Sequence, residues 1–346
     1  MDRIFVVGDI HGCYDELLEL IDKIAFDEHD LLLSVGDIVD RGNKSLEVYH
    51  FFRDLPNAKI IMGNHERKHL NGVLSYAQEI VKLQFKNEYA EFIEWLKDKR
   101  YYFEFDDLIV VHAALEYDKK LEDQNDSVLC GSTAGEKYMQ SKLKLNTFWN
   151  DYYFGEKTIV YGHTVIGNYP KIYNNTIGID TGACHGGLLT AVEFPGQIIH
   201  QVHSKKDYWR EEQQKWQLPI LKEKKWSSLE IKNFEKLKNK LSYVEDAEVK
   251  AYINELENGF SYFKKMYPII ISEIEKLTKS INDEDVNFFN EIANRYSFSS
   301  LIFQSKKGNL TLMSVERNFD TPLKILWIMK ELNLKIDKKW ENLFFE

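Results

Sequence analysis

The chain has 346 residues, a length that indicates more than one domain. Hydrophobic residues make up 44% and charged residues 29%, and this composition is that of an ordinary globular protein and excludes a fibrous or largely disordered chain. Three widely separated cysteines match neither a disulfide framework nor a zinc ribbon, and the apolar run near the N-terminus is too short for a signal peptide or a membrane span, so a cytoplasmic protein with no membrane partner is expected. The net charge of −10 comes from residues 1–204, and this acidity argues against broad binding of nucleic acid.

The first 65 residues alternate short apolar strands with amphipathic helices. Strands are predicted over residues 3–7, 31–35 and 59–62, and helices over 14–24, 44–53 and from about 67 onward. Continuous apolar strands that alternate with helices indicate a parallel sheet that is buried on both faces. Chemistry in such sheets gathers at the carboxyl ends of the strands. A Gly-Asp or Gly-Asn pair follows each of these three strands.

The pattern changes at about residue 101 to short strands joined by brief turns, apart from the interval 113–157. These strands are predicted over 101–105, 108–112, 158–162, 176–180, 188–194 and 197–203, and they indicate a second, largely antiparallel sheet. We therefore expect two domains, residues 1–204 and a mainly helical domain over residues 205–346.

The helical domain is predicted to begin with a connecting helix within 205–226. Helices are expected over 227–279 and 322–332, with a hairpin over 298–315. The basic and aromatic residues of 208–226 suit either single-stranded nucleic acid or a packed helix, and packing is favoured because glutamates interrupt the basic residues.

Five short elements at the ends of predicted strands carry polar side chains of one chemical kind. They are Gly8-Asp9-Ile10-His11-Gly12, Gly36-Asp37-Ile38-Val39-Asp40-Arg41-Gly42, Gly63-Asn64-His65-Glu66, His112 and His163. A mixture of oxygen donors and imidazoles suits Mn²⁺, Fe or Zn²⁺ better than Ca²⁺. Any one element alone could be a helix cap or a hydrogen-bonded histidine, but all five in this order favour a metal centre.

This set of motifs resembles the calcineurin-like metallophosphoesterases, in particular the serine/threonine phosphoprotein phosphatases of bacteria and phages. The resemblance covers roughly residues 1–204 and extends to nothing in residues 205–346. It implies an α/β fold, a four-layer α/β/β/α metallophosphoesterase sandwich, with the helical C-terminal domain as an addition. It also implies a phosphoester hydrolase with two divalent metal ions, of which Mn²⁺ is the expected identity and Fe or Zn²⁺ the alternatives.

The resemblance assigns a role to each polar residue of the motifs. Asp9 and His11 would bind the first metal and Asp37 would bridge both, while the second metal would be completed by Asn64, His112 and His163. The catalytic set would be His65, which protonates the leaving group, Asp40, which orients the His65 ring, and Arg41, which also binds substrate phosphate. The alternatives are a surface arginine for Arg41 and a turn-stabilising aspartate for Asp40. The later residues Asp180 and His185 are interpreted as turn residues.

The expected substrate is a phosphorylated protein or a small phosphomonoester. The alternatives are a bis(5'-nucleosyl)-tetraphosphatase-like activity, action on nucleotide or RNA ends, and a non-catalytic scaffold whose residues 205–346 recruit a protein partner. Glu66 favours the phosphatase, since symmetrical tetraphosphatases of the family tend to have aspartate there. A second arginine, which many relatives place soon after a tryptophan, is missing after Trp149, and Lys157 is the nearest cation in the sequence. A substrate of different shape would be one consequence.

Overall fold

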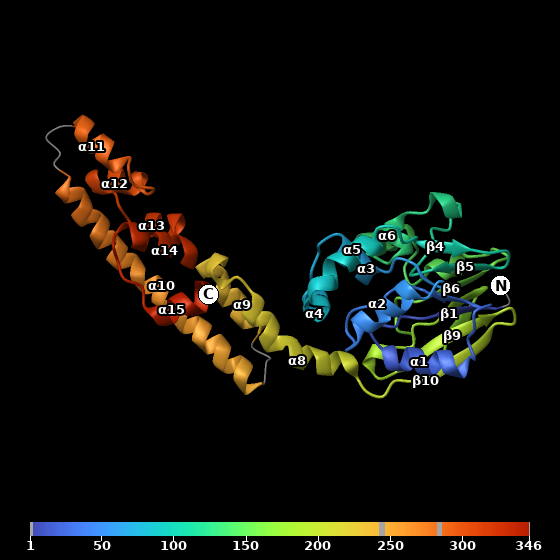
Figure 1. Cartoon of the computed structure of the whole chain (residues 1–346). Coiled ribbons are helices and arrows are strands. Elements are labelled where there is room, and N and C mark those ends of the chain that lie inside the picture. The colour runs from blue at the N-terminus through green and yellow to red at the C-terminus, as the bar shows by residue number, and fades with distance from the viewer. Residues whose placement is uncertain (1–2, 242–245, 282–285, 346) are drawn as a thin grey trace. The chain divides into compact units, whose positions relative to one another are not determined.

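The computed structural model describes residues 3–241, 246–281 and 286–345, and it divides into two compact units (Figure 1). Unit 1 comprises Met1–Trp216 and unit 2 comprises Gln217–Glu346. The geometric boundary falls inside helix α8 (Tyr208–Glu223), which occupies the place of the predicted connecting helix. The domain limits of 1–204 and 205–346 remain a prediction.

The first sheet of unit 1 begins with the predicted parallel strands. Its order is β10-β9-β1-β2-β3, and β1 pairs in parallel with β2, which pairs in parallel with β3. Its strands are β1 (Ile4–Val7), β2 (Leu31–Ser34), β3 (Ala58–Ile60), β9 (Leu188–Phe194) and β10 (Ile198–His203). The helices that follow the first two strands are α1 (Tyr14–Lys23) and α2 (Ser45–Asp54). The alternation of strands and helices predicted for this region is confirmed.

The second sheet differs from the expectation, because its three central strands are parallel. Its order is β4-β5-β6-β8-β7, in which β5, β6 and β8 run parallel and only the two edge strands are antiparallel to their neighbours. Its strands are β4 (Tyr102–Glu104), β5 (Leu108–Val111), β6 (Thr158–Tyr161), β7 (Lys171–Tyr173) and β8 (Thr176–Gly178). The largely antiparallel sheet was therefore a wrong prediction.

The hairpin of β9 and β10 lies in the first sheet, antiparallel to β1, although it was expected in the second. The burial of β9 explains this position. Val192 and Phe194 pack with Val6 of β1 in one core, whereas Leu189 and Ala191 pack with Leu17 of α1 in another. A strand that is apolar on both faces fits between two cores.

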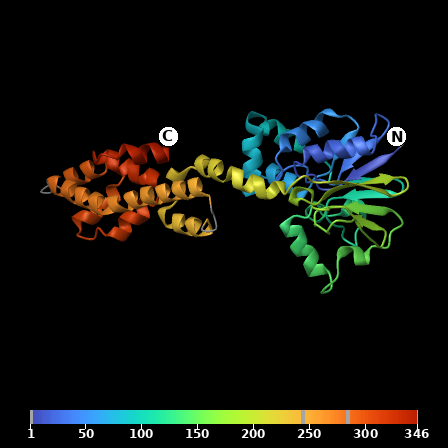
Figure 2. The ribbon, with the colours of Figure 1, turned by 90° about the horizontal axis from the view of Figure 1, so that it is seen from below.

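Unit 1 has the predicted four-layer architecture. Val6, Leu33, Val110 and Val160 form a core to which both sheets contribute, and separate cores lie on the outer face of each sheet. In Figure 2, α1 and α2 lie on one side of the strands and the green segment with α6 and α7 lies on the other. The helices not yet placed are α3 (Asn64–Leu70), α4 (Tyr76–Phe85), α5 (Tyr89–Leu96), α6 (Asp126–Leu129) and α7 (Thr133–Lys142).

Unit 2 is helical and has a hydrophobic core of its own, with Phe260, Phe263 and Ile270 of the long helix α10 at its centre. The helices are α9 (Ile231–Lys240), α10 (Ala247–Ser280), α11 (Val286–Ala293), α12 (Ser299–Lys306), α13 (Leu312–Asn318), α14 (Pro322–Glu331) and α15 (Lys338–Phe345). The hairpin expected over 298–315 was wrong. That stretch forms α12 and the first half of α13, because Leu301, Ile302 and Val315 are buried against the other helices.

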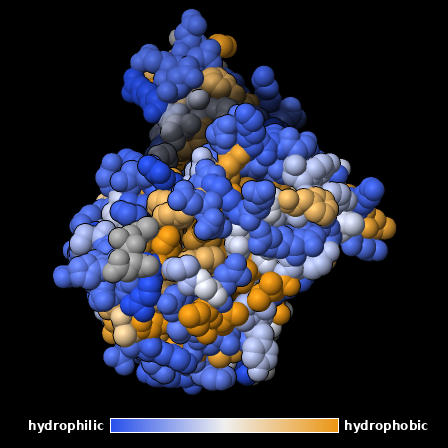
Figure 3. All heavy atoms as spheres, turned by 90° about the vertical axis from the view of Figure 1, so that its right-hand side faces the viewer, coloured by the Kyte–Doolittle hydropathy of each residue, from blue (hydrophilic) through white to orange (hydrophobic). Residues whose placement is uncertain are grey.

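The aromatic residues of 208–226 are largely engaged in packing. Tyr208 is buried in unit 1 and donates a hydrogen bond to Glu16, whereas Trp226 is buried in the core of unit 2. On the face shown in Figure 3, hydrophobic side chains form patches that hydrophilic ones interrupt. None of the helices in the described part of the chain has both the length and the apolar composition that crossing a membrane requires.

Candidate metal centre

The five polar elements meet at the carboxyl ends of strands from both sheets. Asp9 and His11 follow β1, Asp37 follows β2, and Asn64 and His65 open α3 just beyond β3. His112 follows β5 and His163 follows β6. Left-handed backbone conformations at His11, Asp37 and His163 (φ of 47°, 52° and 72°) turn these side chains at the strand ends. Such conformations of non-glycine residues cost about 1–3 kcal/mol each and concentrate at functional sites.

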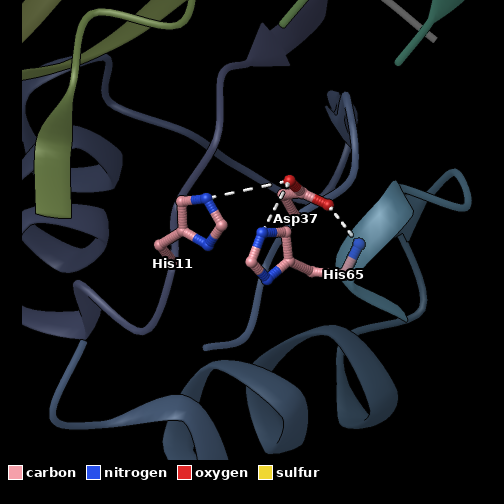
Figure 4. A group of neighbouring side chains, drawn as sticks. All are labelled: His11, Asp37 and His65. Carbon is pink, nitrogen blue, oxygen red and sulfur yellow. Dashed lines mark hydrogen bonds and ion pairs between the residues drawn. The ribbon is translucent and has the colours of Figure 1, made fainter. Parts of the chain in front are cut away.

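One group of potential ligands consists of His11, Asp37 and His65 (Figure 4). Asp37 Oδ2 lies 3.7 Å from His11 Nε2 and 3.9 Å from His65 Nε2, and Asp37 Oδ1 accepts a hydrogen bond of 3.0 Å from the His65 backbone N–H. His11 Nδ1 lies 2.8 Å from the Val39 carbonyl oxygen. That carbonyl accepts a hydrogen bond from Nδ1–H, so the lone pair of His11 Nε2 faces Asp37.

A second group shares Asp37 and adds His112 and His163. His112 Nδ1 lies 2.8 Å from the Val35 carbonyl oxygen, and His163 Nε2 lies 2.9 Å from Glu136 Oε1. Each acceptor fixes the proton on the outer nitrogen of its ring, so the inner nitrogen carries a lone pair.

These inner nitrogens converge on the side-chain oxygen of Asn64. Asn64 Oδ1 lies 3.1 Å from His112 Nε2 and 3.2 Å from His163 Nδ1, and Asp37 Oδ2 lies 3.4 Å from His112 Nε2. In the neutral tautomers just described, all four atoms are acceptors. Four acceptors turned toward one another repel unless a proton or a cation lies between them. The donor set therefore fits a divalent cation.

Asp9 is buried beside the second group but belongs to neither cluster of the described residues. Its carboxylate accepts hydrogen bonds from the His163 backbone N–H at 3.1 and 3.2 Å. Gly162 permits this contact, because a Cβ at that position would lie 2.0 Å from Asp9 Oδ1. Burial, together with the neighbouring Asp180 carboxylate, raises the pKa of Asp9. A cation near Asp9 would offset this repulsion.

In the absence of a cation, the negative charge of Asp37 and the positive charge of protonated His112 stabilise each other. Burial opposes both charges, yet His112 and His65 lower the pKa of Asp37 well below its usual range. Burial likewise acts to lower the pKa of His112, but the Asp37 carboxylate raises it to about 10. A cation bound by this pair would have to displace the His112 proton.

Asp40 is the centre of a buried hydrogen-bond network. Its Oδ2 lies 2.5 Å from His65 Nδ1 and also accepts from Gln78, and its Oδ1 lies 2.9 Å from His69 Nε2. His69 Nδ1 in turn lies 2.9 Å from the Tyr89 hydroxyl. Although burial opposes its charge, the two histidines hold the pKa of Asp40 well below the ordinary value. His69 and Gln78 were not predicted from the sequence, because neither stands at the spacing of a ligand.

Arg41 lies between the rings of His11 and His65. Its Nη1 is 3.1 Å from His11 Nε2 and its Nη2 is 3.0 Å from His65 Nε2, so its guanidinium donates to both rings. The buried Cys184 lies close to Arg41 as well. Arg41 is therefore inside the site rather than a surface arginine.

Two lysines differ in their position relative to the site. Lys157, the nearest cation by sequence, pairs with Glu104 at 2.8 Å and donates to the Phe105 carbonyl. Lys171 of β7 instead lines a cavity together with His163. No sequence signal pointed to Lys171, because its proximity depends on the pairing of the edge strand β7.

Glu66 holds the loop after β2 rather than facing substrate. Its carboxylate accepts four backbone hydrogen bonds, from Asp37 (2.8 Å), Ile38 (2.9 Å), Gly63 (3.1 Å) and Val39 (3.4 Å). The residue is completely buried, and burial and the Asp37 charge raise its pKa to about 8. The presence of glutamate at position 66 therefore gives no direct information about the substrate, whereas the sequence had been interpreted as favouring a phosphatase. Asp180, expected in a turn, accepts a hydrogen bond of 3.0 Å from the Gly182 backbone.

Comparison with known proteins identifies relatives of unit 1. The family model described as calcineurin-like phosphoesterase matches residues 2–253. The bis(5'-nucleosyl)-tetraphosphatase PrpE [asymmetrical] of Halalkalibacterium halodurans is 34% identical over 224 residues, which cover 55% of this chain and 89% of the relative. The protein of the same name from Bacillus subtilis is 31% identical over 221 residues, or 55% of this chain and 90% of the relative. A crystal structure named provisionally as a diadenosine tetraphosphatase has 25% identity and a TM-score of 0.49, and the match covers 58% of this chain and 93% of that one.

Proposed function

Since the chain belongs to the calcineurin-like phosphoesterase family and is a hydrolase, we propose that it cleaves dinucleoside polyphosphates at the metal centre of unit 1. The convergence of acceptor atoms around Asn64 and Asp37 is the observation that carries the proposal. The relatives named as asymmetrical tetraphosphatases favour this substrate over a phosphoprotein. The phosphoprotein phosphatase expected from the motifs is the competing activity.

In this proposal, two divalent cations are held by the residues assigned from the motifs. Asp9 and His11 would bind one, Asn64, His112 and His163 the other, and Asp37 would serve both. When bound, the cations would supply Lewis acidity toward phosphate oxygens and lower the pKa of a water nucleophile. Mn²⁺ is the proposed metal, since oxygen and imidazole donors suit it.

His65 would donate the proton that the leaving phosphate oxygen requires. Asp40 holds the His65 ring through Nδ1, which leaves Nε2 directed into the site. Asp40 is completely buried, so its contact with Nδ1 is shielded from water and holds the ring in one orientation.

Arg41 would bind the phosphate chain through its planar fork. Its N–H groups now point at the nitrogens of His11 and His65. In the loaded enzyme these groups would be released toward phosphate oxygens, because His11 Nε2 would bind a cation.

The test is hydrolysis of diadenosine tetraphosphate by the full chain with Mn²⁺, with products separated by ion-exchange chromatography. ATP and AMP are expected from asymmetric cleavage, and two ADP would indicate symmetric cleavage. The Asp37→Asn and His65→Asn variants should lose the activity by about 100-fold or more. His50→Asn is the matched control, since His50 is half-buried, pairs with Glu88 and belongs to neither group of potential ligands. Faster turnover of a phosphopeptide than of diadenosine tetraphosphate would refute the proposal in favour of the phosphatase.

A further inference from the structure

A cavity of about 400 Å³ adjoins the metal centre. Its lining includes His163 and the adjacent Gly162, together with residues of α7, of the 143–150 segment and of β7. The volume falls within the range of small-molecule sites. A ligand that fills this cavity would therefore lie beside a phosphate held at His163.

The cavity has apolar and aromatic walls. Met139 and Leu143 contribute aliphatic side chains, and Trp149 and Phe148 contribute rings. Phe148 is 64% exposed, and among the described residues no other aromatic ring contacts it. A large ring that is exposed at the rim of a cavity offers a surface on which another flat group can stack.

Two polar side chains in the cavity lining form no ion pair and no side-chain hydrogen bond within the described part of the chain. Lys171 forms no ion pair there, and its Nζ lies 5.2 Å from the centre of the Phe148 ring. Gln140 of α7 is exposed and makes no side-chain hydrogen bond there. Glu136 is different, because it already pairs with His163.

We propose that this cavity binds one nucleoside of a dinucleoside polyphosphate, with its base stacked on Phe148 and a phosphate of the chain paired with Lys171. The inference rests on the proposed function and adds the site that would recognise the base. A nucleotide combines a flat apolar ring, polar edges and negative charge, and the cavity offers the matching ring, amide and ammonium. A phosphoserine or phosphothreonine peptide requires the metal centre but has no ring on the residue that bears its phosphate.

The first test compares diadenosine tetraphosphate with inorganic tetraphosphate, which has the phosphate chain without bases. Phe148→Ala should lower the preference for the dinucleotide, expressed as the ratio of the two kcat/KM values, about 10-fold. Phe148→Tyr should preserve the preference, since its ring still stacks. Phe154→Ala is the control, because Phe154 is another exposed phenylalanine (84%) and lines a different cavity. An unchanged ratio in Phe148→Ala would overturn the inference.

Lys171→Ala should raise KM for both of these substrates, since both have the phosphate chain. Lys157→Ala is its control, because Lys157 is engaged with Glu104. If Lys171→Ala has the same KM as the wild type, the proposed pairing of Lys171 with a phosphate is wrong.

A binding measurement separates this inference from the proposed function. Calorimetry with the Mn²⁺-loaded full chain compares AMP with ribose 5-phosphate, which differ only in the base. AMP should bind about 10-fold more tightly, and Phe148→Ala should abolish the difference. Equal binding of the two by the wild type would overturn the inference even if diadenosine tetraphosphate is cleaved. Base-dependent binding without cleavage of that substrate would refute the proposed function and retain the nucleotide site.

Discussion

The tautomer and the ring orientation of each histidine in the centre are set by the partner of its outer nitrogen. Backbone carbonyls of Val39 and Val35 fix the rings of His11 and His112, and these partners cannot be lost by mutation of a side chain. His163 depends instead on Glu136, whose side chain is 49% exposed. Orienting partners of this kind tune the affinity of a metal site.

Asp40 tests the catalytic part of the proposal. The Asp40→Asn variant should keep the shape of the buried network but lose the carboxylate that accepts from His65 Nδ1 and fixes the tautomer of that ring, so we expect kcat to fall about 100-fold. Metal affinity should stay within about 2-fold, because neither Asp40 nor His65, the ring that Asp40 holds, is among the proposed ligands. Steady-state kinetics and a metal competition assay measure the two quantities. A loss of metal with unchanged kcat in the loaded enzyme would contradict the assignment.

The pKa of His112, which Asp37 raises to about 10, predicts pH-dependent metal binding. Below this pKa the free ring carries a proton, and a cation must displace it. Affinity for Mn²⁺ should therefore increase as pH rises from 6 to 9, by up to about 10-fold per pH unit. Titration against a chelating dye at several pH values provides the measurement. Affinity that is constant over this range, or that falls with rising pH, would contradict the predicted protonation.

Prediction from the sequence succeeded best where a polar residue directly follows an apolar strand in the chain. The oxygen and imidazole donors lie at strand ends, and the chain itself specifies that order. His69, Gln78 and Lys171 were missed because their contacts depend on packing between distant elements. Glu66 was misread for the same reason, since its four backbone partners are invisible in the linear sequence.

At the scale of elements, the loop after β2 depends on α3. Glu66 lies in the first turn of α3 and accepts hydrogen bonds from Asp37, Ile38 and Val39 of that loop. One buried carboxylate thus fixes the backbone that presents Asp37.

The Glu66→Gln variant tests this connection. An amide has one acceptor oxygen, so buried N–H groups of the loop would lose their partner at a cost of about 1–3 kcal/mol. Denaturant unfolding of unit 1 should show that loss of stability. Glu94→Gln is the control, because the Glu94 side chain is 72% exposed and pairs with Lys97 at the surface. Equal stabilities of the two variants would show that the loop does not depend on Glu66.

The elements themselves were predicted unevenly. Strands β1 and β2 were found within about one residue because their apolar runs are continuous and bounded by polar residues. The hairpin β9-β10 was recognised but placed in the wrong sheet, since a strand pattern does not specify its neighbour. Residues 298–315 were misread because short apolar runs are ambiguous between helix and strand.

At the scale of the whole molecule, the two units have separate hydrophobic cores. The proposed ligands all lie in unit 1, so added Mn²⁺ should stabilise that unit by mass action. Calorimetry of the full chain should show two transitions, of which only one shifts upward with Mn²⁺. A single transition that shifts with Mn²⁺ would show instead that the units unfold as one cooperative block. Unit 2 has no assigned activity, and the expected protein partner has gained no support from the comparisons.

The central claim is that Asp37 serves two cations at once, since its carboxylate belongs to both groups of ligands. Anomalous diffraction from crystals of the full chain soaked in Mn²⁺ tests it most directly. The account predicts two peaks, one beside His11 and one beside His112 and His163, with Asp37 contacting both. A single peak, or peaks that Asp37 does not contact, would contradict it.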